Sequence, residues 1–269
     1  RCRGARENKT EPVNFSLASD EDIRRLRQID LADPYLAWLM AHIDQVPAQF
    51  IHVPAGQTVQ HYRRDPGLTF ILLEAASSLL LENLITQEDI AINRLIVWQK
   101  KQSSLRYVQL CGLNNFLANG VQIELLGHQA TASVTQLNYS CGFAQADIET
   151  NIFHRAKATT SQIQVRSAGA GRSTTIYRGL IDVDKTAPGT TGWQGGRALI
   201  LSRQASVDIL PRLDIRTNDV RCSHGVSATH LDDAVLFYMH TRGLSAKQAR
   251  QLALAGFMKQ QLDLSSLLA

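Results

Sequence analysis

The segment LIVWQKKQSSLRYVQL, residues 95–110, contains the pattern on which the predicted fold depends. A short apolar run is followed by a polar corner, a pair of small residues and a second apolar run. Short apolar runs bounded by polar breaks are typical of β-strands, and the small side chains of Ser103 and Ser104 allow the backbone to bend tightly between two of them. The segment therefore predicts two strands joined by a corner.

Three other segments show the same order of features: FILLEAASSLLLENL (70–84), IELLGHQATASVTQL (123–137) and ALILSRQASVDILPRL (198–213). The four small pairs begin at Ser77, Ser103, Ala130 and Ala205. The first two steps between them are nearly equal, and the third is about three times as long. The third step therefore has room for two degraded copies, and the candidates are KATTSQIQV (157–165) and GRSTTIYRGL (171–180).

A unit of strands and corners that recurs at a fixed step is typical of a β-solenoid, in which each turn of the chain stacks on the last. A β-sandwich also has many short strands at even spacing. It does not, however, require the same order of strand, corner and small pair to recur in phase. The recurrence therefore favours a mainly β fold with a solenoid core, which we place at residues 50–225.

The segments on either side of this core have helical patterns. Residues 1–49 consist of a polar leader and two short predicted helices, the second of which begins with a cap and a first-turn proline at Asp33-Pro34. Residues 226–269 predict a helical hairpin, which would cover an end of the solenoid or offer a groove to a partner. Its first helix is expected to end at Gly243. Its second is expected to begin at a capping box and to pack through one side formed by Ala249, Leu252, Ala253 and Phe257.

The composition argues against several classes of protein. The chain has 269 residues, of which 44% are hydrophobic, and can bury a sizeable core, but no apolar stretch approaches the ~20 residues that cross a bilayer. A net charge of +4 is too small and too scattered to predict nucleic-acid binding. The cysteines form no CxxC pair, which indicates free thiols rather than a disulfide framework. Because the first residues also lack the apolar core of a signal peptide, we expect a cytoplasmic protein.

One pair of residues near the end of the solenoid could carry chemistry. In DVRCSHG (219–225), Cys222 and His224 share the parity of an extended segment, so their side chains should leave the same face. A thiolate and an imidazole suit zinc, iron or an iron–sulfur cluster, but such sites need about four ligands. The remaining ligands would have to come from elsewhere in the chain or from a partner. The alternative is that the pair fills the core by chance; a Cys–His hydrolase is less favoured, because nothing marks an oxyanion site.

The other cysteines, histidines and glycines have simpler interpretations. Cys111 and Cys141 follow apolar strand residues and are expected to be buried thiols. His128 and His154 lie at predicted corners or strand ends, where solvated histidine is common. GAGRST (169–174) lacks the spacing and the lysine of a phosphate-binding loop and is interpreted as a glycine-rich corner. We therefore expect no catalytic residue, no ATP bound by this chain and no enzyme activity.

The C-terminal part of the chain resembles the SufB/SufD family of iron–sulfur cluster assembly proteins. The resemblance is carried by DVRCSHG (219–225), LDDAVLFYMHTRGLS (231–245) and ARQLALAGF (249–257). It extends from about Ile51 to the end of the chain and is supported by residues 146–167, 177–183 and 199–202.

SufB-like chains have Cys-Glu-His where this chain has Cys222-Ser223-His224, so the resemblance is closer to SufD. It implies a right-handed parallel β-helix and a scaffold role, with Cys222 and His224 as metal ligands at the interface with a SufB-like subunit that shares a transient iron–sulfur cluster. It also implies that a SufC-like ABC ATPase docks on the C-terminal helices. The candidate partner-binding residues there are Leu236, Phe237, Tyr238, Arg242, Gly243 and Phe257.

Two departures from the family pattern leave other functions open. The chain is shorter than typical members ahead of the β-helix, and TGWQGGR (191–197) lacks the usual Asn between Gln194 and Arg197. A stand-alone homodimeric β-helical interaction protein without cluster chemistry is therefore an alternative. A β-helical enzyme that acts on polysaccharide is a further alternative, although the predicted strands place few carboxylates in register.

Overall fold

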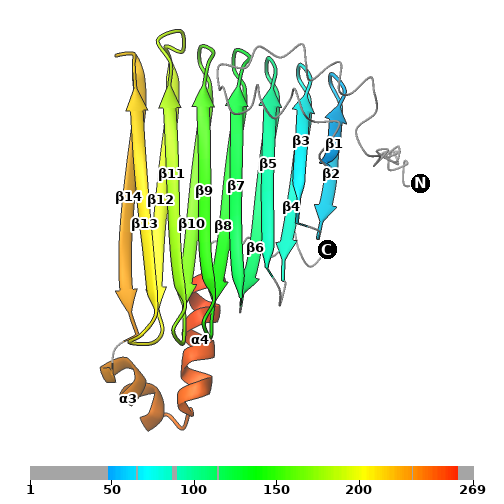
Figure 1. Ribbon diagram of the computed structural model, residues 1–269. Coiled ribbons are helices and arrows are strands. Elements are labelled where there is room, and N and C mark those ends of the chain that lie inside the picture. The colour runs from blue at the N-terminus through cyan, green and yellow to red at the C-terminus, as the bar shows by residue number, and fades with distance from the viewer. Residues whose placement is uncertain (1–47, 65, 87–89, 114, 232, 260–269) are drawn as a thin grey trace, which may run out of the picture.

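The computed structural model describes residues 48–64, 66–86, 90–113, 115–231 and 233–259, which form a stack of β-strands with two C-terminal helices (Figure 1). Sheet A contains the odd-numbered strands in the order β1 (Ala48–Val53), β3 (Leu68–Leu73), β5 (Ala91–Gln99), β7 (Phe116–Leu125), β9 (Gln145–His154), β11 (Thr174–Val183) and β13 (Ser206–Ile215). Sheet B contains the even-numbered strands in the order β2 (Thr58–Arg63), β4 (Ser78–Ile85), β6 (Ser104–Leu113), β8 (Thr131–Ser140), β10 (Thr160–Gly169), β12 (Thr190–Ile200) and β14 (Val220–His230).

Consecutive strands belong to different sheets, and each strand pairs in parallel with the strand two positions along the chain. The chain therefore coils, and each turn contributes one strand to sheet A and one to sheet B. This arrangement confirms the predicted β-solenoid. It excludes the β-sandwich, because the strands of that fold are antiparallel.

The length of a turn increases along the solenoid. In sheet A, the turn that begins at Ala48 closes at its paired residue, Leu68. The turn that begins at Thr174 takes a longer path and closes only at Ser206. The predicted constant step is therefore wrong, because the strands lengthen along the chain while the stacking of turns is kept.

The predicted phase of the small corner residues is right for three of the four positions. The residues that follow Ser77, Ser103 and Ala130 pair with one another across sheet B, so these three corners are stacked. Ala205 instead precedes β13 of sheet A and lies at the opposite corner of the turn. A small buried residue also closes this second corner in two of the later turns, as Ala144 does before β9 and Ser173 does before β11. In that part of the solenoid small residues recur every half turn, which the assumption of one per turn had missed.

A left-handed backbone conformation recurs at the stacked corners. Ala76, Gln102, Gln129 and Ala158 adopt positive φ angles of 56°, 57°, 61° and 55°, although none of them is glycine. This conformation costs roughly 1–2 kcal/mol per residue. The cost is offset by hydrogen bonds between turns, since the Ala76 amide donates to the Lys101 carbonyl at 2.8 Å and the Gln102 amide donates to the His128 carbonyl at 2.9 Å.

The space between the two sheets, here called the lumen, contains the core. Apolar side chains from the turns before the last are fully buried in it, among them Ile71, Leu81, Val97, Val134 and Ile148. Polar side chains are buried there as well, and four of them are glutamines: Gln99, Gln109, Gln136 and Gln194.

Strand β14 continues past the predicted end of the core at residue 225. It pairs in register with β12 from Val220, opposite Thr190, to His230, opposite Ile200. The predicted boundary is therefore too early. Residues 226–230 lack a run of apolar side chains that would mark a strand, but the ladder with β12 gives their backbone groups hydrogen-bond partners.

Two helices follow, α3 (Asp233–Thr241) and α4 (Ala246–Lys259), and form the predicted hairpin. Gly243 follows α3 with a positive φ of 84°, as expected of a residue that terminates a helix. The predicted capping box begins α4. The Ser245 amide donates to Gln248 Oε1 at 2.9 Å, and the Gln248 amide donates to Ser245 Oγ at 3.3 Å.

Helix α4 packs against the solenoid. Ala253, Leu254, Phe257 and Met258 contact a buried cluster formed by Ala168, Leu199 and Leu201, and the Arg166 guanidinium lies 5.2 Å from the centre of the Phe257 ring. Leu252 was predicted to share this face but is 56% exposed. Leu252 is exposed because the side of the helix that packs against the solenoid is centred on Ala253, Leu254, Phe257 and Met258, and Leu252 lies on the opposite side from these four.

The predicted N-terminal helices and the polar leader lie outside the described residues. Among the helices that the structure describes, none has the length and apolar character needed to cross a membrane.

Candidate functional site

Cys222 and His224 lie on β14, the last strand of sheet B. One edge of β14 pairs with β12, and no described strand pairs with the other edge. Cys222 is directly opposite Gly192 and His224 is directly opposite Gln194. Val220 and Cys222 pack against the core in the lumen, and His224 shares their parity. The two side chains therefore lie on the inward face of the last turn.

The Cys222 thiol is half-buried. Burial raises the pKa of this thiol above its ordinary value, and a hydrogen bond with the backbone of Gly192 acts in the opposite direction. Gly192 also provides the space that the sulfur occupies, because a Cβ atom at this position would lie 3.2 Å from Cys222 Sγ. Burial therefore favours the protonated thiol, which lies beside the backbone amide of Gly192.

His224 is exposed, and no described residue forms a hydrogen bond with its ring. Within the part of the chain that the structure describes, no group of three or more His, Cys, Asp or Glu side chains is arranged to hold a metal ion. Cys222 and His224 thus form two neighbouring donors, one soft and one borderline, which is fewer than the about four that zinc or a cluster requires.

The end of the solenoid that carries this pair is open. Val183 and Ile215 are directly paired inward positions in consecutive turns. Val183 is fully buried, whereas Ile215 in the last turn is 38% exposed, and Val226 on β14 is 45% exposed. The last turn therefore presents apolar inward-facing side chains on which no described turn stacks.

The candidate partner-binding residues fall on two different sides of the helical hairpin. Phe237 and Tyr238 are 70% and 59% exposed, and the Arg242 guanidinium lies 5.4 Å from the centre of the Tyr238 ring. Leu236 is half-buried and Gly243 lies in the turn between the helices. Phe257, by contrast, faces the solenoid and anchors α4.

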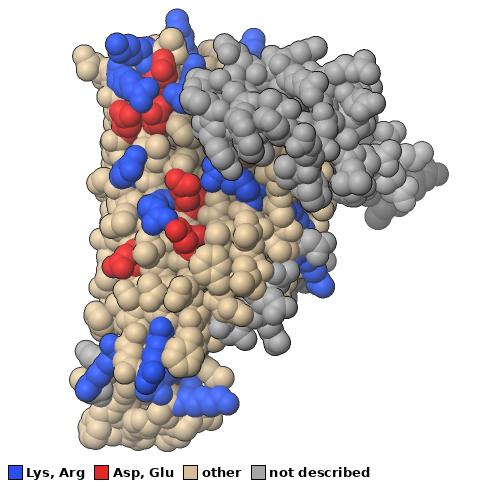
Figure 2. All heavy atoms as spheres, in the orientation of Figure 1, with Lys and Arg blue, Asp and Glu red and all other residues tan. Residues whose placement is uncertain are grey.

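The exposed face of the hairpin is basic as well as apolar. Residues 234–259 contain no Asp or Glu and carry Arg242, Lys247, Arg250 and Lys259. Figure 2 shows these positive side chains over the helices, interspersed with uncharged surface, whereas acidic and basic side chains are mixed over the strands.

Comparison with known families bears on this arrangement. Residues 68–257, which include the solenoid from β3 onward, the Cys222–His224 pair and nearly all of the helical hairpin, match the family model described as "SUF system FeS cluster assembly, SufBD core domain". The chain belongs to the SufBD family.

Individual proteins are similar to between about half and three quarters of the chain. The iron–sulfur cluster assembly protein SufD of Escherichia coli (strain K12) is 27% identical over 141 residues, which cover 52% of this chain and 33% of the relative. A SufBD family protein of Mycobacterium tuberculosis (strain ATCC 25618 / H37Rv) is 29% identical over 137 residues, or 51% of this chain and 16% of the relative. Protein ABCI7, chloroplastic, of Arabidopsis thaliana is 23% identical over 206 residues, which cover 75% of this chain and 43% of the relative. The chain thus spans less than half the length of each of these relatives.

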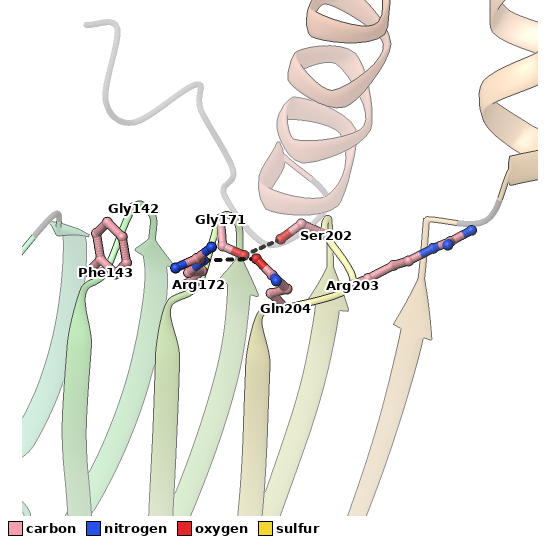
Figure 3. Close-up of a pocket in the computed structure, with 7 residues that line it drawn as sticks. All are labelled: Gly142, Phe143, Gly171, Arg172, Ser202, Arg203 and Gln204. Carbon is pink, nitrogen blue, oxygen red and sulfur yellow. Dashed lines mark hydrogen bonds between the residues drawn. The ribbon is translucent and has the colours of Figure 1, made fainter.

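The other residues that the sequence analysis considered lie away from the Cys222–His224 pair. GAGRST is a corner, as predicted, and with the neighbouring corners it lines a hollow of about 710 Å³ beside Phe143, Arg172 and Arg203 (Figure 3). This hollow lies where β10 and β12 end, whereas Cys222 lies where β14 begins. Cys111 is buried as predicted, but Cys141 is only half-buried, and its thiol donates to the Leu113 carbonyl at 3.4 Å.

The two other histidines have different environments. His128 is exposed at a corner, as predicted. The prediction of a solvated ring was wrong for His154, which is fully buried. Its Nδ1 lies 2.7 Å from Thr159 Oγ1 and its Nε2 lies 2.8 Å from Ser161 Oγ, so two hydroxyls in the following corner and strand replace water. Burial, reinforced by the charge of Arg155, lowers the pKa of His154 to about 4.

Sequence reasoning missed two residues that surround the pair, Gly192 and Gln194. They occupy inward positions of β12, the strand that pairs with β14. The signal was present in TGWQGGR, because glycines at alternate positions leave space on the inward face of a strand. The register between β12 and β14 was needed to show which residue faces which.

The buried neutral ring of His154 predicts a pH-dependent loss of stability. The unfolded ring takes up a proton near pH 6.5 and the folded ring only near pH 4, so this contribution is fully present above pH 6.5 and is lost as the pH falls toward 4. Between pH 7 and pH 5 the loss amounts to roughly 2 kcal/mol. The free energy of unfolding in urea is measured for the wild type and for His154→Gln at both pH values. It should fall further between pH 7 and pH 5 in the wild type than in the variant. His128→Gln serves as the control and should behave as the wild type; equal falls in the wild type and His154→Gln would contradict the assignment.

Proposed function

We propose that this chain is a scaffold subunit of a SUF-type iron–sulfur cluster assembly complex. In this proposal, Cys222 and His224 contribute part of the ligand set of a nascent cluster at a seam with a second, SufB-like subunit. The observation that carries the proposal is the position of the pair: both donors lie on the inward face of the last turn, at an open end of the solenoid. A subunit that covers this end would meet both donors.

The two free edges at this end differ in what they offer to a partner. Strand β13 has Pro211 near its middle, which lacks an amide donor and is tolerated at the edge of a sheet. Strand β14 has no proline along Val220–His230, and no described strand pairs with its outer edge at any point along its length. We therefore place the seam along β14. A strand added there would lie directly beside Cys222 and His224.

The chemistry at the seam follows from the environment of the thiol. Iron and sulfide are the cargo of the scaffold, and a cysteine binds them as thiolate. Because burial raises the pKa of Cys222, loading must displace the proton of the thiol, and ligands from both subunits would stabilise the thiolate together. The site then stays unreactive in the separate chain and becomes competent when the second subunit arrives.

The helical hairpin is proposed as the dock for a SufC-like ABC ATPase. Phe237 and Tyr238 supply exposed aromatic surface and the basic residues around them supply positive charge. Exposed aromatic and arginine side chains of this kind are common energetic centres of interfaces. Phe257 is excluded from the dock, since its ring packs between α4 and the strands.

A homodimer is the second candidate, and the same open end favours it. The free edge of β14 can pair with β14 of a second copy of the chain related by a twofold axis. This pairing would bring two copies of Cys222 and His224 to one seam. The two candidates differ in what co-purifies with the chain and in whether the chain alone holds a cluster.

Replacement of either donor should reduce cluster content without preventing assembly. The chain is co-purified with its own SufB-like and SufC-like partners, loaded anaerobically with Fe²⁺ and sulfide, and assayed for iron, sulfide and visible absorbance. Cys222→Ala and His224→Ala should each retain at least about tenfold less cluster, because loss of a ligand costs no less than loss of an outer-shell group. Cys141→Ala, another half-buried thiol, should behave as the wild type. Wild-type cluster content in both donor variants would contradict the role of the pair, and a cluster held by the chain alone would favour the homodimer.

Truncation of an exposed aromatic ring on α3 should weaken the ATPase dock. Phe237→Ala is expected to cost about 2 kcal/mol of binding free energy, measured by calorimetric titration with the SufC-like partner. Phe143→Ala is the matched control, since Phe143 is 72% exposed and Phe237 is 70% exposed. Circular dichroism establishes that both variants are folded. Equal affinities for the two variants would remove the proposed dock.

A further inference from the structure

Gln194 is a buried polar residue whose hydrogen bonds are not made. Its side chain is 2% exposed, and neither its Oε1 nor its Nε2 has a hydrogen-bond partner among the residues that the structure describes. A buried amide in this state destabilises a fold, and such groups in native proteins call for an explanation. Gln136, buried in the same lumen, shows the usual outcome: its Nε2 donates to Gln109 Oε1 at 3.4 Å, and its Oε1 accepts from Thr150 Oγ1 at 2.7 Å.

The position of Gln194 relates it to the Cys222–His224 pair. It lies directly opposite His224 on the neighbouring strand, with its side chain on the inward face that His224 shares. Paired parallel strands are separated by about 4.8 Å. The side chain of a glutamine can therefore reach the ring of His224 by a change of rotamer in either residue.

The glycines around Gln194 leave its side chain room to move. Gly192 and Gly196 are its inward neighbours on β12, so Gln194 is the longest inward side chain beside the pair. In the structure its amide lies in a notch left by Gly179 on β11, where a Cβ atom would be 1.8 Å from Gln194 Nε2. The amide occupies this space but forms no hydrogen bond there with a described residue.

The ring of His224 lacks what the amide could provide. A histidine that binds a metal through one ring nitrogen usually donates a hydrogen bond from the other, and that bond fixes both the orientation of the ring and the position of its proton. No described residue forms such a bond with His224, whereas the carboxamide oxygen of Gln194 is an unused acceptor.

We propose that Gln194 is a positioning residue for His224. Its amide hydrogen-bonds the ring nitrogen that faces away from the ligand, which holds the imidazole in the orientation and tautomer needed at the seam. Without a bound ligand the amide of Gln194 makes no hydrogen bond with a described residue, which destabilises the fold but leaves the amide available to His224. The inference rests on the proposed function for the identity of the ligand, but the contact between the two side chains is tested independently of it.

The experiment compares two buried glutamines, one unbonded and one bonded. The full chain is labelled with ¹⁵N-histidine, and the ring nitrogens of His224 are observed by NMR, without metal and with Zn²⁺ as the probe. Gln194→Met keeps the length and bulk of the side chain but removes both polar atoms. It should shift the tautomer balance of the His224 ring toward that of free histidine in at least one of the two states. Gln136→Met should leave the ring unchanged.

Stability separates positioning from simple core filling. Gln194→Met removes unsatisfied polar atoms and should leave the urea midpoint equal or higher, whereas Gln136→Met breaks made hydrogen bonds and should lower it. Unchanged His224 ring signals in Gln194→Met, both with and without Zn²⁺, would overturn the proposal, and so would a ring change equally large in Gln136→Met.

Cluster content in the assembled complex tells this proposal apart from the proposed function. A changed ring in Gln194→Met together with wild-type cluster content in Cys222→Ala and His224→Ala would support the contact and contradict the cluster role of the pair. Loss of cluster in those two variants with an unchanged ring would do the reverse. If both proposals hold, Gln194→Met lowers cluster content while the complex still assembles.

Discussion

The structure depends on the hydrogen-bond ladder between stacked turns. Each turn receives its backbone partners from the turns before and after it, which is how a chain with several non-glycine residues in left-handed corners remains ordered. The same rule creates an exception at the end of the stack. The last strands have partners on one side, and the inward side chains there, Ile215 and Val226, remain partly exposed. An edge of this kind is normally protected by short length, charge, proline or a covering element.

The chain protects one edge and leaves the other available. Pro211 removes an amide donor from β13, whereas β14 is long, has no proline and carries Cys222 and His224 on its inward face. The chemical groups of the pair are thus found at the place where the fold most needs another subunit. Among the described residues the donor set is incomplete and the solenoid edge is unpaired at the same point, which is why we propose that a second subunit completes both. The unbonded amide of Gln194 behind His224 extends this pattern into the adjacent strand.

Much of this could be predicted from the sequence, and what could not has physical reasons. The alternation of apolar runs, corners and small residues such as Ser103 is local, and it was sufficient to predict the solenoid. The capping box at Ser245 is also local and was predicted correctly. The phase of Ala205, the burial of His154 and the exposure of Leu252 depend on which segments stack or pack against each other, and a linear pattern does not contain that information. Gln194 lies opposite His224 because of the register between β12 and β14, which only the hydrogen-bond ladder between these strands determines.

The most direct test of the account is backbone hydrogen exchange along β14, measured for the chain alone and for its complex with the SufB-like partner. Every second amide of β14 faces the free edge. If a partner strand completes the solenoid, these amides, across Val220–His230, exchange rapidly in the separate chain and become protected in the complex, while β8 in the middle of the stack is protected in both. If the amides of β14 exchange at the same rate in both states, the seam lies elsewhere and the account is contradicted.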